Sequence, residues 1–111
     1  MKSFVYLASP YSHADERVMF SRFEAACQAA AKLMLAGETV FSPIAHSHPV
    51  CVHIAGVQTD FEFWMKQDLP ILRCAEKLLV LMLPGWEQSR GVTEEIRVAK
   101  TEGIPVEYID L

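Results

Sequence analysis

The sequence has few cysteines, fewer basic than acidic residues and no long apolar segment, and each of these features argues against a class of protein. The three cysteines, Cys27, Cys51 and Cys74, are odd in number and form no C-x-x-C motif. This argues against a disulfide framework and a zinc knuckle and is typical of free thiols in a reducing compartment. No segment is long and apolar enough for a membrane span, and the N-terminus lacks an apolar signal region. We therefore expect a cytoplasmic protein with no membrane partner.

Acidic residues outnumber basic ones by 14 to 10, which gives a formal net charge of -4. This surplus argues against a nucleic-acid polymer or an anionic membrane as the partner, but it permits a small anionic ligand at one local site. Hydrophobic residues make up 51% of the 111-residue chain and charged residues 22%, as in an ordinary globular protein. This length suits one hydrophobic core, so we expect a single domain that spans residues 1–111.

Short apolar segments alternate with segments of helical periodicity. Strands are expected at residues 4–8, 39–41, 77–83 and 105–109, and helices at residues 12–36, 59–72 and 89–102. Ser12 with Asp15 resembles a capping box, Thr59 or Asp60 is expected to cap the second helix, and Pro70 to kink or restart it. Residues 42–58 have no clear period and are expected to form an irregular loop. The alternation predicts an α/β fold, a small doubly wound (flavodoxin- or Rossmann-like) parallel sheet of four to five strands flanked by helices.

A doubly wound sheet binds ligands beyond the carboxyl ends of its strands. Three strands are expected to lead there into Ser9-Pro10-Tyr11, into Ser42-Pro43 and into residues 84–91, so these segments should converge on one site. The last segment runs into a helix start at Ser89, where free backbone N–H groups can bind an anion. Ser89 is equally well explained as an ordinary N-cap residue. Gly91 costs about 1 kcal/mol inside a helix and is better explained by a ligand close to the backbone.

Two carboxylates fall on helix faces that the periodicity predicts to be buried. Glu95 shares its face with Val92, and Asp68 shares its face with Trp64. A buried carboxylate is costly unless something compensates for it, so an acid/base or nucleophile pair is one interpretation. The alternatives are that Asp68 caps a helix restarting at Leu69-Pro70, and that Glu95 pairs with an arginine such as Arg73 or Arg90, or with a subunit partner.

Three histidines, His46, His48 and His53, lie in the expected loop. His46 and His48 would point to the same side of an extended segment, which suggests a metal site. No acidic or cysteine cluster accompanies them, so we expect no metal ligands here. Trp64 is expected to be a core or rim residue, or a surface on which a base stacks.

Three motifs, in this order, resemble those of the nucleoside 2-deoxyribosyltransferase-like superfamily. They are Tyr6-Leu-Ala-Ser-Pro-Tyr11, Gln67-Asp68-Leu69 and Ser89-Arg-Gly91-Val-Thr-Glu-Glu95. Within the superfamily, the short chain and the stretch Ser42-Pro43-Ile44-Ala45-His46 resemble the small DUF1937 group. The resemblance implies a double displacement at the anomeric carbon of a deoxynucleoside or its 5′-monophosphate, through a covalent glycosyl–glutamate that is resolved by another base or by water.

The resemblance also implies roles for individual residues. Glu95 matches the nucleophile, Asp68 the acid that helps to protonate the departing base, and Tyr6 the residue that orients the glutamate. Ser89 and the amide of Gly91 match the binding site of a 5′-phosphate, and no cofactor takes part. Together with the convergent segments and the aromatic candidate, the expected substrate-binding residues are Ser89, Gly91, Ser9, Pro10, Pro43 and Trp64.

Relatives complete their sites with residues of a neighbouring subunit, which implies a homo-oligomer with the apolar face of residues 61–72 as the candidate interface. The sequence departs from the family pattern at Ser9, where a glycine is usual, and at Glu94, which adds an acid near the expected phosphate site. These departures favour an alternative function, a nucleotide-binding or sensing module without turnover. Another alternative is hydrolysis of a different nucleotide glycosidic bond.

Overall fold

A parallel four-stranded sheet lies at the centre of the computed structural model, which describes residues 3–54 and 60–110. The strands are β1 Val5–Ala8, β2 Val40–Phe41, β3 Lys77–Leu81 and β4 Val106–Ile109, in the spatial order β2-β1-β3-β4. Each neighbouring pair is parallel. The helices are α1 Glu16–Leu35, α2 Pro43–Cys51, α3 Phe61–Leu72 and α4 Arg90–Thr101, with a short 3-10 turn, η1 Trp86–Gln88, before α4. The predicted doubly wound α/β fold is confirmed.

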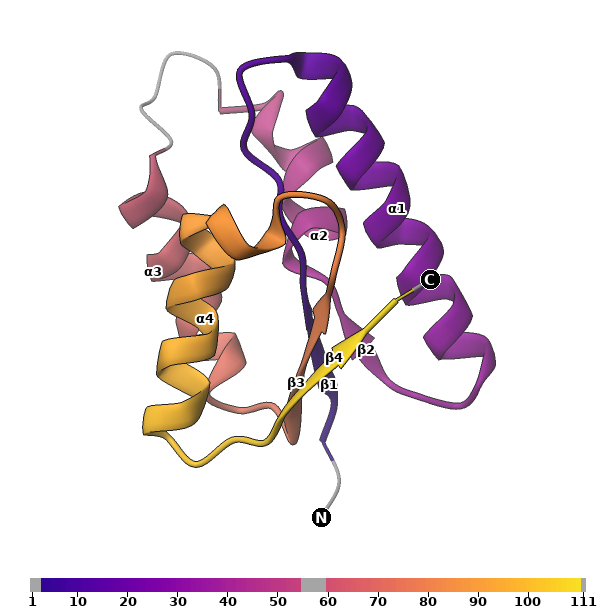
Figure 1. Ribbon diagram of the computed structural model, residues 1–111, viewed down its shortest axis with the longest axis vertical. Helices are drawn as coiled ribbons and strands as arrows, with labels where there is room; N and C mark the ends of the chain where they lie inside the picture. Colours follow the sequence, from indigo (N-terminus) through magenta and orange to yellow (C-terminus); the bar gives the residue numbers. More distant parts are fainter. Residues whose placement is uncertain (1–2, 55–59, 111) are drawn as a thin grey trace.

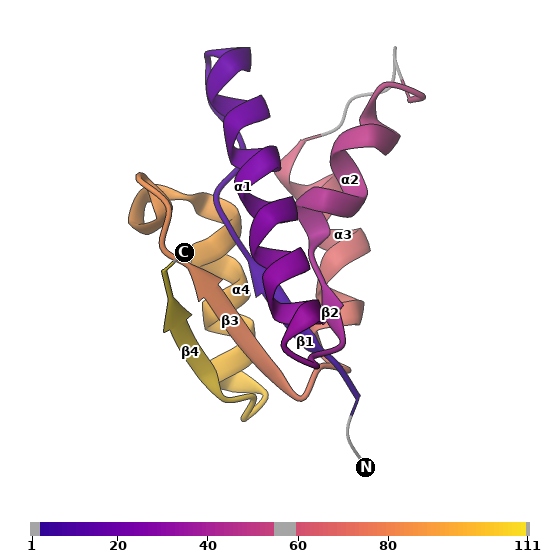
Figure 2. The same ribbon diagram turned by 90° about the vertical axis from the view of Figure 1, so that its right-hand side faces the viewer.

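Helices cover both faces of the sheet (Figure 1). The side chains of Val5 and Leu7 pack with α1, whereas those of Tyr6 and Ala8 pack on the opposite side with α3 and α4. Successive residues of a strand point to opposite faces, so a strand covered on both sides must be apolar throughout. Helix α2 lies beside α1 at the β2 end of the sheet (Figure 2).

Helix α1 begins one turn later than a cap at Ser12 would place it. The carboxylate of Asp15 accepts a hydrogen bond from the amide of Arg17 at 2.9 Å, which makes Asp15 the N-cap. The capping box predicted at Ser12 is therefore wrong. The helix ends at Leu35, and Gly37 follows with φ +102°, a left-handed conformation that glycine adopts without steric cost.

The irregular loop predicted over residues 42–58 is wrong over its first part, which forms α2. Ser42 caps this helix by accepting a hydrogen bond from the amide of Ala45 at 3.2 Å, and Pro43 occupies its first turn. A proline is favourable there because the first turn needs no backbone donor. Proline therefore marks the beginning of a helix here rather than a loop. Residues 55–59 of the predicted loop lie outside the described residues.

Helix α3 runs without a break through Pro70 to Leu72, so the predicted restart is wrong. Its N-cap is Asp60, whose side chain accepts from the amide of Phe63 at 2.9 Å, while the alternative cap Thr59 lies outside the described residues. Asp68 is buried in the middle of this helix. Its interpretation as the cap of a restarted helix is therefore also wrong.

Arg22 of α1 ties two loops together at the carboxyl edge of the sheet. Its guanidinium donates to the carbonyl of Ser12, after β1, at 3.0 Å and to the carbonyl of Pro84, after β3, at 3.1 Å. The next residue, Gly85, has φ +90°, and a Cβ at this position would lie 2.6 Å from the Arg22 Nη2 atom. Glycine at position 85 thus leaves room for the arginine that holds the two loops side by side.

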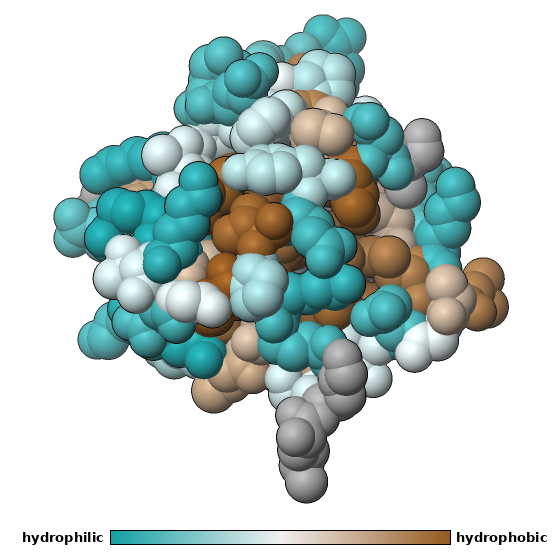
Figure 3. Space-filling model, turned by 60° about the horizontal axis from the view of Figure 1, so that its bottom comes forward, coloured by the Kyte–Doolittle hydropathy of each residue, from teal (hydrophilic) through white to brown (hydrophobic). Residues whose placement is uncertain are grey.

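The end of the molecule opposite this edge has a mixed surface. Apolar side chains reach the surface there between hydrophilic ones (Figure 3). Among the described residues, no helix combines the length and the apolar character needed to cross a membrane.

Candidate active site

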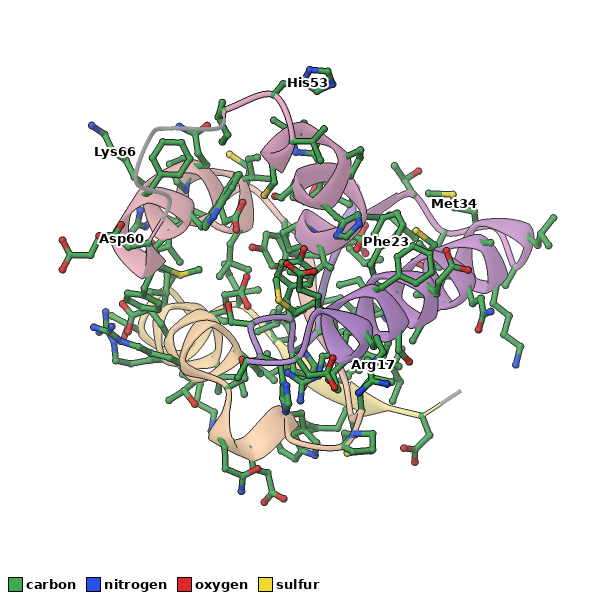
Figure 4. The ribbon with its side chains drawn as sticks, turned by 90° about the horizontal axis from the view of Figure 1, so that it is seen from above. Arg17, Phe23, Met34, His53, Asp60 and Lys66 are labelled. Carbon is green, nitrogen blue, oxygen red and sulfur yellow. The ribbon has the colours of Figure 1, made fainter. Side chains whose placement is uncertain are left out.

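A cavity of about 660 Å³ opens at the carboxyl edge of the sheet. It is bounded by the segment after β1, by α2, by α3 and by the start of α4, which is where the sequence predicted the converging segments to meet. Figure 4 looks down on this end of the molecule. The volume lies within the range of small-molecule sites. Carboxylates and aromatic rings line it together: Asp60, Asp68, Glu95, Tyr11, Phe61 and Trp64.

Glu95 reaches this cavity from the first turns of α4. Ser89 caps the helix by accepting from the amide of Val92 at 3.2 Å, and the helical spacing then places Glu95 on the same inward face as Val92. The Glu95 side chain is buried, with 3% of the residue exposed, as the periodicity predicts. The hydroxyl of Tyr6, on β1, donates a hydrogen bond to Glu95 Oε2 at 2.5 Å. The sheet and α4 thus hold the carboxylate in one position.

Asp68 lines the same cavity from α3, which packs against α4. Only 6% of the residue is exposed, so this carboxylate too is largely removed from water. The structure therefore brings together two acids that are 27 positions apart in sequence, on neighbouring helices. Both predicted burials are confirmed.

The two acids have raised pKa values because they are buried. Desolvation raises the pKa of Glu95 to about 8, with the Asp68 charge adding to the rise and the Tyr6 hydrogen bond opposing it. Desolvation raises the pKa of Asp68 to about 6. Burial, followed by the charges of Glu95 and Asp68, raises the pKa of Tyr6 well above its usual value, so this phenol remains a donor. Near neutral pH the two acids therefore hold about one proton between them.

The start of α4 forms another wall of the cavity. Ser89, Arg90 and Gly91 line it, and among the described lining residues Arg90 is the one cation. The Arg90 guanidinium lies 3.9 Å from the centre of the Phe61 ring, a cation–π contact. A Cβ added at Gly91 would meet only the Cε of Met65, at the ordinary contact distance of 3.8 Å. Packing within the chain therefore does not require glycine at position 91.

Comparison with known proteins assigns the family. A sequence model described as Domain of unknown function (DUF1937) matches residues 3–110. The chain belongs to the DUF1937 family. Among solved structures, this DUF1937 protein is similar to a 2-deoxyribosyltransferase from the psychrotolerant bacterium Bacillus psychrosaccharolyticus, with a TM-score of 0.67 and 23% sequence identity over 97% of this chain and 72% of that chain. This similarity establishes a shared fold. No curated protein matches the sequence.

The other expected substrate-binding residues of the DUF1937 protein divide into two groups. Ser9 and Trp64 line the cavity. Pro10 and Pro43 are fully buried and do not line it. The Oγ atom of Ser9 is buried and has no hydrogen-bond partner among the described residues. Because buried hydroxyls are normally paired, Ser9 is suited to receive a polar group of a ligand.

Glu94, which the sequence predicted to add negative charge near the anion site, does not face the cavity of the DUF1937 protein. Its carboxylate accepts two hydrogen bonds from the guanidinium of Arg97, at 2.8 and 2.7 Å. It borders a separate hollow of about 330 Å³ between α3 and α4 instead. Its charge is therefore neutralised on the outer side of the helix that carries Glu95.

The histidines of this DUF1937 protein do not form the extended pair that the sequence predicts. His46 and His48 lie in α2, so their side chains diverge, and His53 points away from the molecule in Figure 4. Within residues 3–54 and 60–110, no group of three or more metal-ligating side chains comes together.

The face of α3 that was the candidate oligomer interface is used inside the monomer. Phe61, Trp64, Met65 and Asp68 line the cavity, and Leu72 belongs to the core. Phe61, Trp64 and Met65 remain partly exposed, so a homo-oligomer of the DUF1937 protein with this face as its interface remains a prediction.

Several lining residues, among them Tyr11 and Arg90, were absent from the substrate-binding residues expected from the sequence. Tyr11 follows β1 directly beyond Ser9-Pro10, and Arg90 stands between Ser89 and Gly91. The sequence could have indicated both residues, because each lies in a segment that was expected to converge on the site.

Proposed function

We propose that this DUF1937 protein breaks the N-glycosidic bond of a deoxynucleoside or a deoxynucleoside 5′-monophosphate, by transfer or hydrolysis. The observation that supports this most directly is a buried glutamate, Glu95, which receives a hydrogen bond from Tyr6 and shares a cavity with a second buried acid, Asp68. A retaining glycosidic reaction requires a nucleophilic carboxylate and an acid, each with a suitable environment. The structural neighbour's activity as a 2-deoxyribosyltransferase is in keeping with this assignment.

In the proposed first step, an oxygen of the Glu95 carboxylate attacks the anomeric carbon C1′ of the sugar. The bond from C1′ to the base nitrogen breaks, and its electron pair leaves with the base. Asp68 supplies the proton that neutralises the departing base. The product is a glycosyl ester on Glu95. In the second step another base or a water attacks C1′, Asp68 takes up the proton of that nucleophile, and the Glu95 carboxylate is released.

Tyr6 supports the first step by favouring the ionised form of Glu95. Burial favours the protonated carboxylic acid, and the phenol hydrogen bond favours the carboxylate. The bond goes to Oε2, which leaves Oε1 as the attacking oxygen. The reactive form of the pair has its one proton on Asp68, and it is the minor form near pH 7 because Glu95 has the higher pKa.

The remaining cavity walls suit the parts of a nucleoside or nucleotide. Tyr11, Phe61 and Trp64 provide aromatic faces for a planar base. Arg90 and the free amides at the start of α4 provide positive potential for a 5′-phosphate. The direct test incubates the protein with a panel of deoxynucleosides and their monophosphates, with and without a second base, and separates the products by chromatography. Absence of free base and of exchanged nucleoside from every substrate contradicts the proposal.

The rate of the proposed reaction is expected to follow a bell-shaped pH profile. Below about pH 6 both acids carry protons and the nucleophile is lost, and above about pH 8 neither acid carries one and the departing base receives no proton. The maximum of kcat/KM is therefore expected at about pH 7. Initial rates measured from about pH 5 to about pH 9 check this. A profile without a decline on the alkaline side would remove the acid from the mechanism.

Gly91→Ala is expected to separate binding from stability. Alanine gains up to about 1 kcal/mol of helix propensity over glycine, and the structure has room for its Cβ. Unfolding in urea should therefore show equal or greater stability. The added methyl lies where a ligand phosphate would approach the α4 amides, so KM for a monophosphate should rise about ten-fold, a loss comparable to one charge-assisted hydrogen bond. Gly37→Ala, far from the cavity, is the control for KM alone, because the φ of +102° at Gly37 makes alanine destabilising there. Unchanged KM in Gly91→Ala would contradict an anion site at this helix start.

A nucleotide-binding module without turnover is the second candidate function. It is favoured by the burial that raises the pKa of Glu95 to about 8, because a protonated carboxyl is not a nucleophile. Saturable binding of a nucleotide in calorimetry, with no product after long incubation, would select this function. Release of a base from a nucleotide that is not a deoxynucleotide would instead select hydrolysis of another glycosidic bond.

A further inference from the structure

Helix α2 places His48 against a residue of the cavity wall. The Tyr11 hydroxyl and the His48 Nδ1 atom are 2.6 Å apart and form a hydrogen bond across 37 positions of sequence. Tyr11 lines the cavity, whereas His48 does not. Any influence of the histidine on a ligand must therefore pass through the tyrosine.

Aromatic side chains of α1 fix the His48 ring from the other side. Phe23 stacks on the imidazole with ring centres 4.0 Å apart and an interplanar angle of 19°, and Phe20 meets it more steeply at 6.1 Å. Figure 4 shows Phe23 extending from α1 towards α2. The Tyr11 ring meets the imidazole edge-on, at 5.7 Å and 86°. These contacts hold the plane of the imidazole, in which Nδ1 lies at hydrogen-bond distance from the tyrosine hydroxyl.

The Tyr11 hydroxyl is in its neutral, donating form. Partial burial raises the pKa of Tyr11 above its usual value, and the neighbouring Cys51 raises it further. A neutral imidazole that carries its proton on Nε2 has a free acceptor at Nδ1. The hydrogen bond then runs from the phenol to the imidazole, and it fixes the direction of the phenol as well as its distance.

We propose that His48 is a positioning residue: it accepts the Tyr11 hydrogen bond and holds the tyrosine ring as the cavity wall against which the base of the substrate packs. The inference rests on the proposed function for the nature of the ligand. It goes beyond that function because it gives α2 and one of the unexplained histidines a part in substrate binding. A wall fixed in advance lowers the entropy that binding would otherwise lose.

The test compares two substitutions of His48. His48→Leu keeps an apolar side chain against Phe23 and removes the acceptor, so KM for the deoxynucleoside is expected to rise about five-fold, with kcat changed less than about two-fold. His48→Asn places an amide oxygen near the position of Nδ1 and is expected to restore most of the affinity. In a Tyr11→Phe background, which lacks the donor, His48→Leu should have no further effect on KM. A fall in kcat or stability that His48→Asn does not restore would show a merely structural role and overturn the proposal.

A second readout does not depend on turnover. Cys51 lines the cavity beside Tyr11, so release of the tyrosine should expose its thiol. In a protein carrying Cys27→Ser and Cys74→Ser, alkylation of Cys51 by iodoacetamide is expected to be about five-fold faster with His48→Leu than with His48→Asn. Equal alkylation rates would overturn the positioning role. If alkylation differs as expected but the protein cleaves no nucleoside, the positioning role of His48 stands and the proposed function is wrong.

Discussion

Glu95→Gln is expected to abolish base release and base exchange, with a loss on the order of 10⁴-fold in kcat. The amide cannot form the glycosyl ester, while its size and its oxygen preserve the contact with the Tyr6 hydroxyl. Chromatography of products after long incubation gives the sensitivity that this measurement needs. Activity within ten-fold of the unsubstituted protein, at about the level of a binding contact, would exclude Glu95 as the nucleophile.

The same substitution is expected to stabilise the fold at alkaline pH. The pKa of Glu95 is about 8 in the folded protein against 4.5 for an ordinary glutamate, so folding favours the protonated form. The stability from this group is fully present below about pH 4.5 and is lost as the pH rises through about 8. Glutamine does not titrate. At about pH 9, urea unfolding should therefore show Glu95→Gln to be more stable by up to about 5 kcal/mol, and the difference should vanish in mild acid.

The adjacent acid offers a matched control. Glu94→Gln removes a carboxylate from the same helix, but that carboxylate pairs with Arg97 and lies outside the cavity. Its activity should stay within about two-fold, and its stability should fall by no more than about 1 kcal/mol, as for an exposed ion pair. Equal losses of activity in Glu94→Gln and Glu95→Gln would point to a general charge effect rather than to nucleophilic catalysis.

Asp68→Asn is expected to lower kcat by about 10²- to 10⁴-fold, because the departing base then receives no proton from the enzyme. The size of the loss should depend on the base. A 2-deoxyriboside with an activated leaving group, such as a nitrophenolate, needs no proton and should be cleaved at nearly the unsubstituted rate in the first step. Comparison of the burst-phase rate constants for natural and activated substrates measures this difference.

Asp60→Asn controls for the loss of a negative charge from the cavity. Asp60 lines the same cavity, but it is exposed and caps α3. Since asparagine also caps helices well, both stability and turnover should change little. An equal loss for activated and natural substrates in Asp68→Asn would contradict its role as the acid.

Sequence periodicity predicted the buried positions of Glu95 and Asp68 because both lie in helices, where spacing determines the face of each residue. The Tyr6–Glu95 hydrogen bond could not be predicted in this way. It joins residues 89 positions apart and depends on β1 lying next to β3 in a parallel register. Only the resemblance to a known family suggested this pairing.

The region around α2 was predicted least well, and the reason is physical. Proline and histidine have low helix propensity, so residues 43–51 have the composition of a loop. The cap at Ser42, the tolerance of the first turn for Pro43 and the packing of α2 against α1 together outweigh that propensity. The same misprediction concealed the contact of His48 with Tyr11, because an extended segment would have directed this side chain elsewhere.

The parallel order of the strands also has a consequence for synthesis of the chain. β1 is made first, yet its partner β2 begins 35 positions later and β3 begins 72 positions later. A nascent chain on the ribosome therefore exposes β1, all four residues of which are buried in the folded protein, until the second half of the protein has emerged. The Tyr6–Glu95 contact cannot form before α4 has left the exit tunnel. For this chain, folding on the ribosome and assembly of the site are both late events.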